Sequence, residues 1–280
     1  MPATKDQVQT ANGSTPDITI FRGWKDPGKY VWSPFVIKLE ARLRFAGVRY
    51  NVDAGSIKTS PKGKIPYVEC STPSSSNISE TTVAQKSLLS DSTLIISTMA
   101  EWNTIPDLNA AMQPEDRAKD LGLRALLENK LYHYHGFERW TQNYYTMRDH
   151  ILWSAPYPVK VIVGLIIYRK TIAMLHGEGT GRFSPEEIAM FRSEIWESFS
   201  DLLRASKSKR PDAGNEHPFW VLGGNDPTEV DFVLFGFIVS VLICAAAPDS
   251  QKVVKSFPIL VEYADRIHDQ YFPDYEKWSL

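Results

Sequence analysis

Residues 33–47 have the sequence Ser-Pro-Phe-Val-Ile-Lys-Leu-Glu-Ala-Arg-Leu-Arg-Phe-Ala-Gly, which is typical of one complete helix. Apolar residues recur at helical spacing from Phe35 to Ala46, a serine precedes a proline at the start, and a glycine follows the end. The β-branched and aromatic run at residues 17–22 indicates a strand before this helix, and residues 48–53 indicate a strand after it. The sequence therefore predicts a β-α-β unit with parallel strands.

A second sheet segment and a short helix are expected next. Residues 65–69 form a strand candidate with a proline near its start, which suits an edge strand or a tight turn. Residues 88–90 can return beside it, and the serine- and threonine-rich residues 71–86 are interpreted as a loop inserted in this hairpin. Asp91-Ser92 then caps a helix over residues 93–103.

From residue 106 onward only helical patterns occur. The spacing predicts one long helix over 115–140, and others over 157–175 and from about 257 to 271. Ser184-Pro185-Glu186-Glu187 predicts a capping box for a helix ending near 206, and Thr228 with Asp231 does the same for the apolar helix at 232–247. We expect a disordered tail at 1–16, an α/β domain at 17–104 and an all-α domain at 105–280.

Composition excludes several classes of protein. The chain has 280 residues, 43% hydrophobic and 23% charged, which is ordinary for a globular protein. With 31 basic against 33 acidic residues, the net charge is −2, so we expect no nucleic-acid partner. Cys70 and Cys244 lie far apart, which favours neither a disulfide framework nor a zinc site. We expect no transmembrane segment, since the apolar run at 232–247 is shorter than roughly 20 residues.

This order of elements resembles the glutathione transferase fold, a thioredoxin-like domain followed by an all-helical domain. Four local matches carry the resemblance: Ser33-Pro34-Phe35, Gly63–Val68 around Pro66, Asp91–Ile95, and Gly224–Asp231. Within that superfamily, Leu131-Tyr132-His133, Arg139-Trp140 and the Gly179–Arg182 turn resemble the branch of metaxin-like and failed-axon-connections proteins. The segment at 52–62 is too short for the family's full second helix.

The resemblance implies a glutathione site. Ser33 would donate its hydroxyl to the glutathione sulfur, with Tyr30 as the other candidate; by its position alone Ser33 is equally well a plain N-cap. Pro66 would be cis, so that the backbone of Ile65 pairs with the tripeptide, whereas composition alone favours a trans edge proline.

The resemblance also implies partners for the two ends of the tripeptide. Asp91 and Ser92 would hold the γ-glutamyl end, although a plain N-cap pair is the ordinary interpretation of these residues. Lys64 would meet the glycine carboxylate, although a solvated lysine beside a turn is more common.

A second, apolar substrate would lie against the early part of the helical domain. Tyr132, His133, Phe137 and Trp140 are aromatic at helical spacing, as either a pocket or a core would require. His133 and His135 point to different faces of a helix, and neither a cysteine nor an acidic pair accompanies them, so we expect no metal site.

The resemblance thus implies a glutathione-dependent transferase acting on a hydrophobic small molecule, by conjugation, isomerisation or thioether or ether cleavage. A cytoplasmic homodimer with a role in detoxification is what the resemblance implies. The alternatives are a non-catalytic metaxin-like adaptor and a glutathione-dependent carrier of apolar ligands.

Overall fold

The structure is a computed structural model that describes residues 17–72, 85–209 and 218–279. The expected tail at 1–16 and most of the hairpin insertion at 71–86 lie outside the described residues. The chain divides into two compact units. The first unit comprises the chain up to Lys25 together with Val48–Ile105, and the second comprises Asp26–Gly47 together with Pro106 onward.

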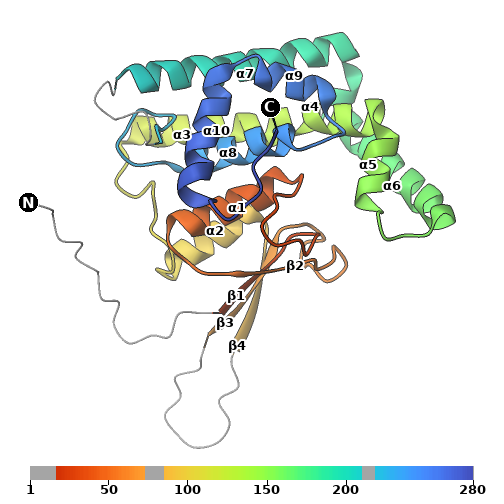
Figure 1. Ribbon diagram of the computed structural model, residues 1–280, viewed down its shortest axis with the longest axis horizontal. Coiled ribbons are helices and arrows are strands. Elements are labelled where there is room, and N and C mark those ends of the chain that lie inside the picture. Colours follow the sequence, from red (N-terminus) through yellow and green to blue (C-terminus); the bar gives the residue numbers. More distant parts are fainter. Residues whose placement is uncertain (1–16, 73–84, 210–217, 280) are drawn as a thin grey trace, which may run out of the picture. The chain divides into compact units, whose positions relative to one another are not determined.

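The first unit is a four-stranded mixed sheet with one helix (Figure 1). Its elements are β1 (Asp17–Phe21), β2 (Asn51–Asp53), β3 (Tyr67–Thr72), β4 (Gln85–Ser90) and α2 (Ser92–Glu101). The strand order is β2-β1-β3-β4; β1 and β2 are parallel, and the other neighbours are antiparallel. The parallel pairing of the two strands that flank residues 34–45 is confirmed, as is the returning hairpin.

The second unit is all helical in its described residues. Its elements are α1 (Pro34–Phe45), α3 (Pro114–Leu126), the π-helix η1 (Leu127–Leu131), α4 (Tyr132–Phe137), the π-helix η2 (Glu138–Gln142), α5 (Tyr144–Ile151), α6 (Tyr157–Gly177), the 3-10 turn η3 (Thr180–Arg182), α7 (Pro185–Ser208), α8 (Glu229–Leu242), α9 (Pro248–Lys255) and α10 (Pro258–Tyr271). The expected helix over 115–140 is one helical path interrupted by two π segments. The short helices α5 and α9 were not predicted.

Helix α8 forms the centre of the second unit (Figure 1), and every residue from Val230 to Leu242 is buried. Buried carboxylates accept hydrogen bonds from backbone N–H groups at and near its first turn. Asp231 accepts the backbone N–H groups of Val221 and Thr228 at 2.7 and 2.8 Å and the Tyr263 hydroxyl at 3.0 Å. Asp120 accepts the Val230 N–H at 2.8 Å. These bonds satisfy donors that a buried helix start leaves without intrahelical partners.

Helix α1 packs directly on α8 and lies in the second of the two compact units. The division into domains at 17–104 and 105–280 stays a prediction. A Cβ atom added at Gly236 of α8 would lie 2.5 Å from the Pro34 carbonyl oxygen and 3.1 Å from the Lys38 nitrogen. Both contacts are to backbone, so neither can be relieved by a side-chain rotation. The absence of a side chain at Gly236 is therefore what lets the start of α1 approach α8.

We predict that Gly236→Ala lowers the free energy of unfolding by about 2–4 kcal/mol, because the added methyl group overpacks a backbone contact. Gly122→Ala is the matched control, since Gly122 is also helical but has nothing within 4 Å of an added Cβ. That change is expected to be neutral or to stabilise by about 0.5–1 kcal/mol. Urea unfolding of both variants tests this, and equal effects would contradict the close approach.

Candidate functional site

Ser33 stands at the N-terminus of α1 with its hydroxyl uncommitted to capping. Its backbone is extended, with φ −89° and ψ 115°, and its side chain makes no cap hydrogen bond. The first hydrogen bond of the helix runs from the Ile37 N–H to the Ser33 carbonyl at 3.3 Å. The N–H groups of Phe35 and Val36 precede this bond and therefore have no acceptor within the helix. No acidic residue lies in the first turn. The positive end of the helix dipole is therefore available to an anion.

Arg139 holds the chain just before Ser33. One guanidinium nitrogen donates to the Trp32 carbonyl at 3.1 Å and another to the Ser240 carbonyl of α8 at 3.2 Å. Arg139 lies in η2, where a π segment re-aims side chains relative to a regular helix. The sequence showed Arg139 only as part of a family resemblance, because its two partners are about a hundred positions away in the chain.

Tyr30, the other candidate for the sulfur contact, lies in the core of the second unit. Its hydroxyl is 2.8 Å from His268 Nδ1, and its ring contacts those of Phe272 and Tyr275 at centroid distances of 5.2 and 5.0 Å. Burial raises the pKa of the Tyr30 phenol far above its ordinary value. We therefore assign Tyr30 to packing and correct that expectation.

In the first unit, the peptide bond between Ile65 and Pro66 is cis, as expected. Ile65 is half-buried and Pro66 is buried at the start of β3. The preceding loop is tied to β4: the Ser60 hydroxyl donates to the Lys64 carbonyl at 2.7 Å and lies 3.0 Å from the Ser90 hydroxyl. The sequence offered no signal for this role of Ser60.

The loop that replaces a second helix is closely packed. Gly55 has φ +62°, and an added Cβ would lie 2.5 Å from the Tyr67 hydroxyl and 2.6 Å from Phe21 Cβ. The Tyr67 hydroxyl accepts the Ser56 N–H at 3.1 Å and lies 2.7 Å from the Thr59 hydroxyl. As expected, residues 54–62 contain no helix. The hydrogen bonds to Tyr67 and Ser60 hold the loop that leads to Ile65 in place, although the loop contains no helix.

Asp91 and Ser92 begin α2. Asp91 has φ +80° and ψ 120°, a conformation that non-glycine residues rarely adopt. Its Oδ1 accepts the N–H groups of Thr93 and Leu94 at 3.1 and 3.4 Å. Ser92 is buried at the first helical position. Capping alone does not require positive φ at an aspartate, because an ordinary N-cap residue is extended. Lys64, by contrast, is simply exposed.

Comparison with known proteins finds a matching family and a related protein. Residues 34–147 match the family described as glutathione S-transferase N-terminal domain. The protein "Failed axon connections" of Drosophila melanogaster is 24% identical over 99% of this chain and 63% of its own length. This chain therefore spans less than two thirds of that relative. The chain is thus similar to the glutathione S-transferase N-terminal domain family over residues 34–147, which are less than half of its length.

Solved structures agree with this glutathione transferase fold. FzlA from C. crescentus is 13% identical, with 94% of this chain and 93% of that chain covered and a TM-score of 0.55. A glutathione transferase family member from Pseudomonas fluorescens pf-5, solved with two glutathione molecules bound, is also 13% identical. It covers 91% of this chain and 89% of its own, with a TM-score of 0.52. At such identities the likeness shows the fold: a thioredoxin-like domain followed by a helical domain.

The four aromatic residues expected to line a transferase pocket occupy different surroundings. Tyr132 contacts Phe35 of the first turn of α1, with ring centroids 5.0 Å apart. His133 is bonded through Nδ1 to the Asn129 carbonyl at 2.9 Å. Phe137 packs on the main core, and Trp140 belongs to a separate cluster. Trp140 lies within the π-helix η2, whereas the other three residues lie in α4, so the regular helical spacing expected for the four is interrupted. Tyr132 lies beside the first turn of α1, and Trp32, the residue before Ser33, packs against the cluster that contains Trp140.

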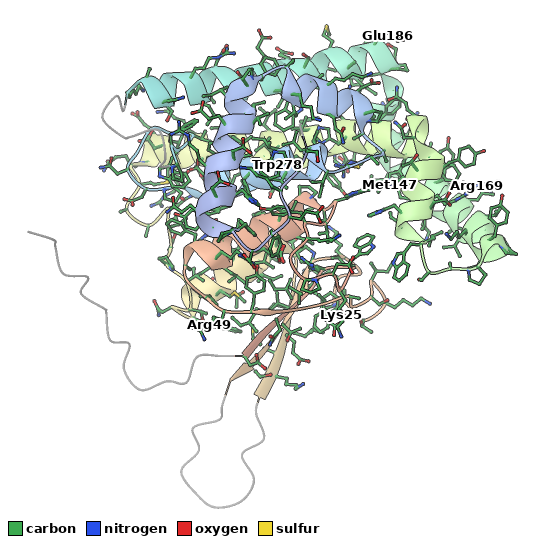
Figure 2. All side chains as sticks on the ribbon, viewed as in Figure 1. Lys25, Arg49, Met147, Arg169, Glu186 and Trp278 are labelled. Atoms are coloured by element: carbon green, nitrogen blue, oxygen red, sulfur yellow. The ribbon has the colours of Figure 1, made fainter. Side chains whose placement is uncertain are left out.

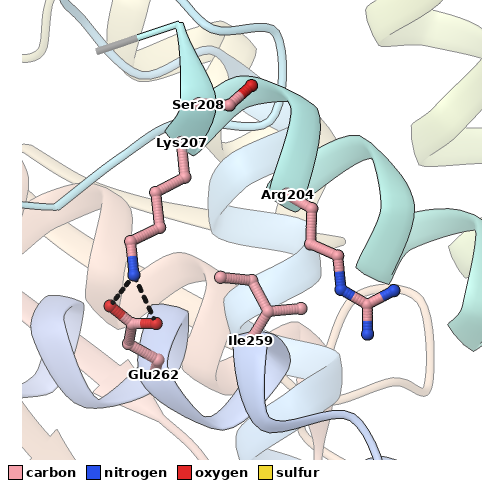
Figure 3. A pocket seen from close by; sticks show the side chains of 5 residues that line it. All are labelled: Arg204, Lys207, Ser208, Ile259 and Glu262. Atoms are coloured by element: carbon pink, nitrogen blue, oxygen red, sulfur yellow. Dashed lines mark hydrogen bonds and ion pairs between the residues drawn. The ribbon is translucent and has the colours of Figure 1, made fainter. Parts of the chain in front are cut away.

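Two of the hollows in the described part of the second unit differ in their relation to the predicted site. One, of about 470 Å³, lies over α7 and α10 (Figure 3), where the Lys207 ammonium pairs with both oxygens of Glu262 at 2.6 and 2.8 Å. The other, of about 380 Å³, is lined in part by Tyr30, Trp32 and Trp278. It reaches the residue before Ser33, whereas the first hollow contains none of the predicted site residues.

Neither a metal-holding cluster nor a membrane-spanning helix is found among the described residues. In residues 17–72, 85–209 and 218–279, no group of three or more His, Cys, Asp or Glu side chains could hold a metal ion. Across the same ranges, none of the helices combines the length and apolarity needed to cross a bilayer.

Trp32 stacks on His150 with ring centroids 3.5 Å apart and an interplanar angle of 10°. Burial, with a smaller contribution from the nearby Arg139 guanidinium, lowers the pKa of His150 to about 4. The unfolded chain therefore binds a proton to this ring more readily than the folded chain does. The stabilisation that this implies is complete above about pH 6.5 and is lost as pH falls toward 4.

The unfolding free energy of the wild type should fall as the pH is lowered from 7 to 4.5. We predict that this decrease is smaller in His150→Gln by about 1–3 kcal/mol. Urea unfolding across that range measures the slope, which is the informative quantity because the substitution also removes the stack. An unaltered slope in His150→Gln would show that this imidazole charges freely in the folded protein.

Proposed function

We propose that this protein binds glutathione and activates its thiol for attack on an apolar electrophile, or for a related isomerisation or thioether or ether cleavage. The observation that carries the proposal is the start of α1, where the Ser33 hydroxyl makes no cap bond and no carboxylate occupies the first turn. A glutathione thiol has a pKa of about 8.5, so catalysis at neutral pH requires stabilisation of the thiolate. A hydroxyl donor and a helix N-terminus supply it.

The remaining tripeptide would be held by groups of the first unit. In the proposal, the Ile65 N–H and C=O pair with the glutathione backbone in the manner of an added strand. The γ-glutamyl carboxylate takes the Ser92 hydroxyl and N–H, and the Asp91 carboxylate pairs with the ammonium group. The positive φ of Asp91 supports this role, because strained backbone clusters at ligand sites. Lys64, exposed nearby in sequence, would meet the glycine carboxylate.

The second substrate would contact Tyr132 and the aromatic residues near Ser33. Tyr132 touches Phe35 in the first turn of α1, and Trp32 immediately precedes Ser33. An apolar electrophile suits this aromatic environment. Phe137 and Trp140 are left out of the proposed contact, since both are committed to packing.

Assembly and location are parts of the same proposal. Leu88, Leu94 and Trp102 of the first unit are exposed, which supports a homodimer formed through that unit. A cytoplasmic detoxification enzyme is the setting in which such a site would work. The likeness to "Failed axon connections" favours, as the second candidate, a non-catalytic adaptor or glutathione-dependent ligand carrier.

We expect calorimetric titration to give micromolar to low-millimolar affinity for reduced glutathione. Asp91→Ala should weaken binding by about tenfold or more, since it removes a charge-assisted contact worth about 1.5–3 kcal/mol. Ser97→Ala is the matched control, because Ser97 is exposed on the same helix and its hydroxyl donates to the exposed Glu101 side chain at 3.4 Å. No heat and no shift in melting temperature with wild-type protein would refute the enzyme and favour the adaptor.

A further inference from the structure

Helix α6 exposes an apolar face that nothing in the described chain covers. Its sequence, Tyr-Pro-Val-Lys-Val-Ile-Val-Gly-Leu-Ile-Ile-Tyr-Arg-Lys-Thr-Ile-Ala-Met-Leu-His-Gly, is mostly apolar and has apolar residues on every side, a pattern typical of a buried helix. Yet Ile162 is 63% exposed, Ile166 49% and Leu165 44%. At the turn that leads into α6, Trp153 and Tyr157 are 66% and 70% exposed. We call these five residues the α6 face.

The other side of α6 is filled by α5, so the α6 face cannot turn inward. A Cβ atom added at Gly164 would lie 2.7 Å from the Arg148 side chain and 2.8 Å from the Tyr144 hydroxyl. The Arg148 guanidinium lies 5.2 Å from the centre of the Tyr145 ring and 5.9 Å from that of Tyr157. Helices α5 and α6 thus form a close-packed pair that projects from the helical unit (Figure 1).

The charged residues of the stretch that contains α6 have one sign. The sequence contains no aspartate or glutamate between Asp149 and Glu178, whereas Lys160, Arg169 and Lys170 lie in α6. Arg169 and Lys170 are exposed, and Figure 2 places Arg169 on the outer side of the helix. In a chain whose net charge is −2, this is a local cationic surface around apolar side chains. Its electrostatic complement is an anionic surface.

A second copy of the chain is a poor occupant of the same face. Antiparallel packing of two α6 helices would bring Lys160 of one toward Arg169 and Lys170 of the other, with no acidic side chain in either helix to compensate. Like charges across an interface are unfavourable. A lipid surface has no such conflict: aliphatic side chains enter the acyl boundary, tryptophan and tyrosine lie at headgroup depth, and basic groups meet anionic headgroups.

We propose that the α6 face is a docking surface for membranes that contain anionic lipid. The helix lies in the plane of the interface and does not span the bilayer. The area of contact comes from Ile162, Leu165 and Ile166, the interfacial anchors are Trp153 and Tyr157, and Arg169 and Lys170 supply the dependence on lipid charge. This docking is independent of glutathione binding.

Flotation of the full chain with phosphatidylcholine vesicles, with and without phosphatidylserine, tests the proposal. Wild-type protein should float with the phosphatidylserine vesicles and much less with phosphatidylcholine alone, and added salt should release part of it. Ile162→Glu and Leu165→Glu should each lower the partition coefficient by about tenfold or more, since each removes a buried aliphatic side chain. Arg169→Glu with Lys170→Glu should abolish the preference for phosphatidylserine.

Leu121→Glu is the matched control, because Leu121 is 59% exposed on α3, away from the α6 face, and is expected to float like wild type. Circular dichroism checks that each variant is folded. The proposal is overturned if wild-type protein stays unbound with phosphatidylserine vesicles, or if both aliphatic variants float as well as wild type. It is also overturned if sedimentation shows that Ile162→Glu converts a dimer to a monomer, which would assign the face to a second copy.

Discussion

The contact between α1 and α8 is the constraint on which the helical unit and its candidate catalytic group depend. Because Gly236 has no side chain, the backbones of the two helices can approach closely at the start of α1. Two cations of α1 are then buried and paired: Lys38 with Glu128 at 2.7 Å and Arg42 with Glu229 at 2.8 Å. Breaking such a pair leaves a buried charge and typically costs 3–5 kcal/mol. Ser33 is thereby held at a defined position beside the core helix.

The buried polar groups of this core connect its helices to one another. Asp231 and Asp120 satisfy the start of α8. Glu138 in η2 accepts the Asp249 N–H at 2.8 Å and pairs with Arg192 at 2.5 Å, which ties α7 and α9 to the long helical path. The next residue, Arg139, reaches back to the chain before Ser33. A capping network that looks purely structural therefore extends to the proposed site of thiol activation.

The sequence predicted those elements that depend on residues close to one another in the chain. Helix α1, the capping box at Ser184 and the parallel strands around α1 follow from spacing, caps and strand composition, and the resemblance added the cis bond at Pro66. The unit to which α1 belongs could not be predicted, because Lys38 and Arg42 are charged residues of the kind usually exposed, and their partners are 90 and 187 positions away. The His150 stack and the burial of Tyr30 depend on contacts across similar separations.

The central claim is that Ser33 and the start of α1 stabilise a thiolate, and the pKa of bound glutathione measures this directly. Ultraviolet absorbance of the thiolate, followed over pH in wild-type and Ser33→Ala protein saturated with glutathione, gives that pKa. A helix-terminus and hydroxyl contribution of about 1.4 kcal/mol corresponds to a thiol pKa about one unit below that of free glutathione in the wild type. In Ser33→Ala the pKa of the bound thiol should rise most of the way back to that of free glutathione. Identical values in the two proteins would contradict the account.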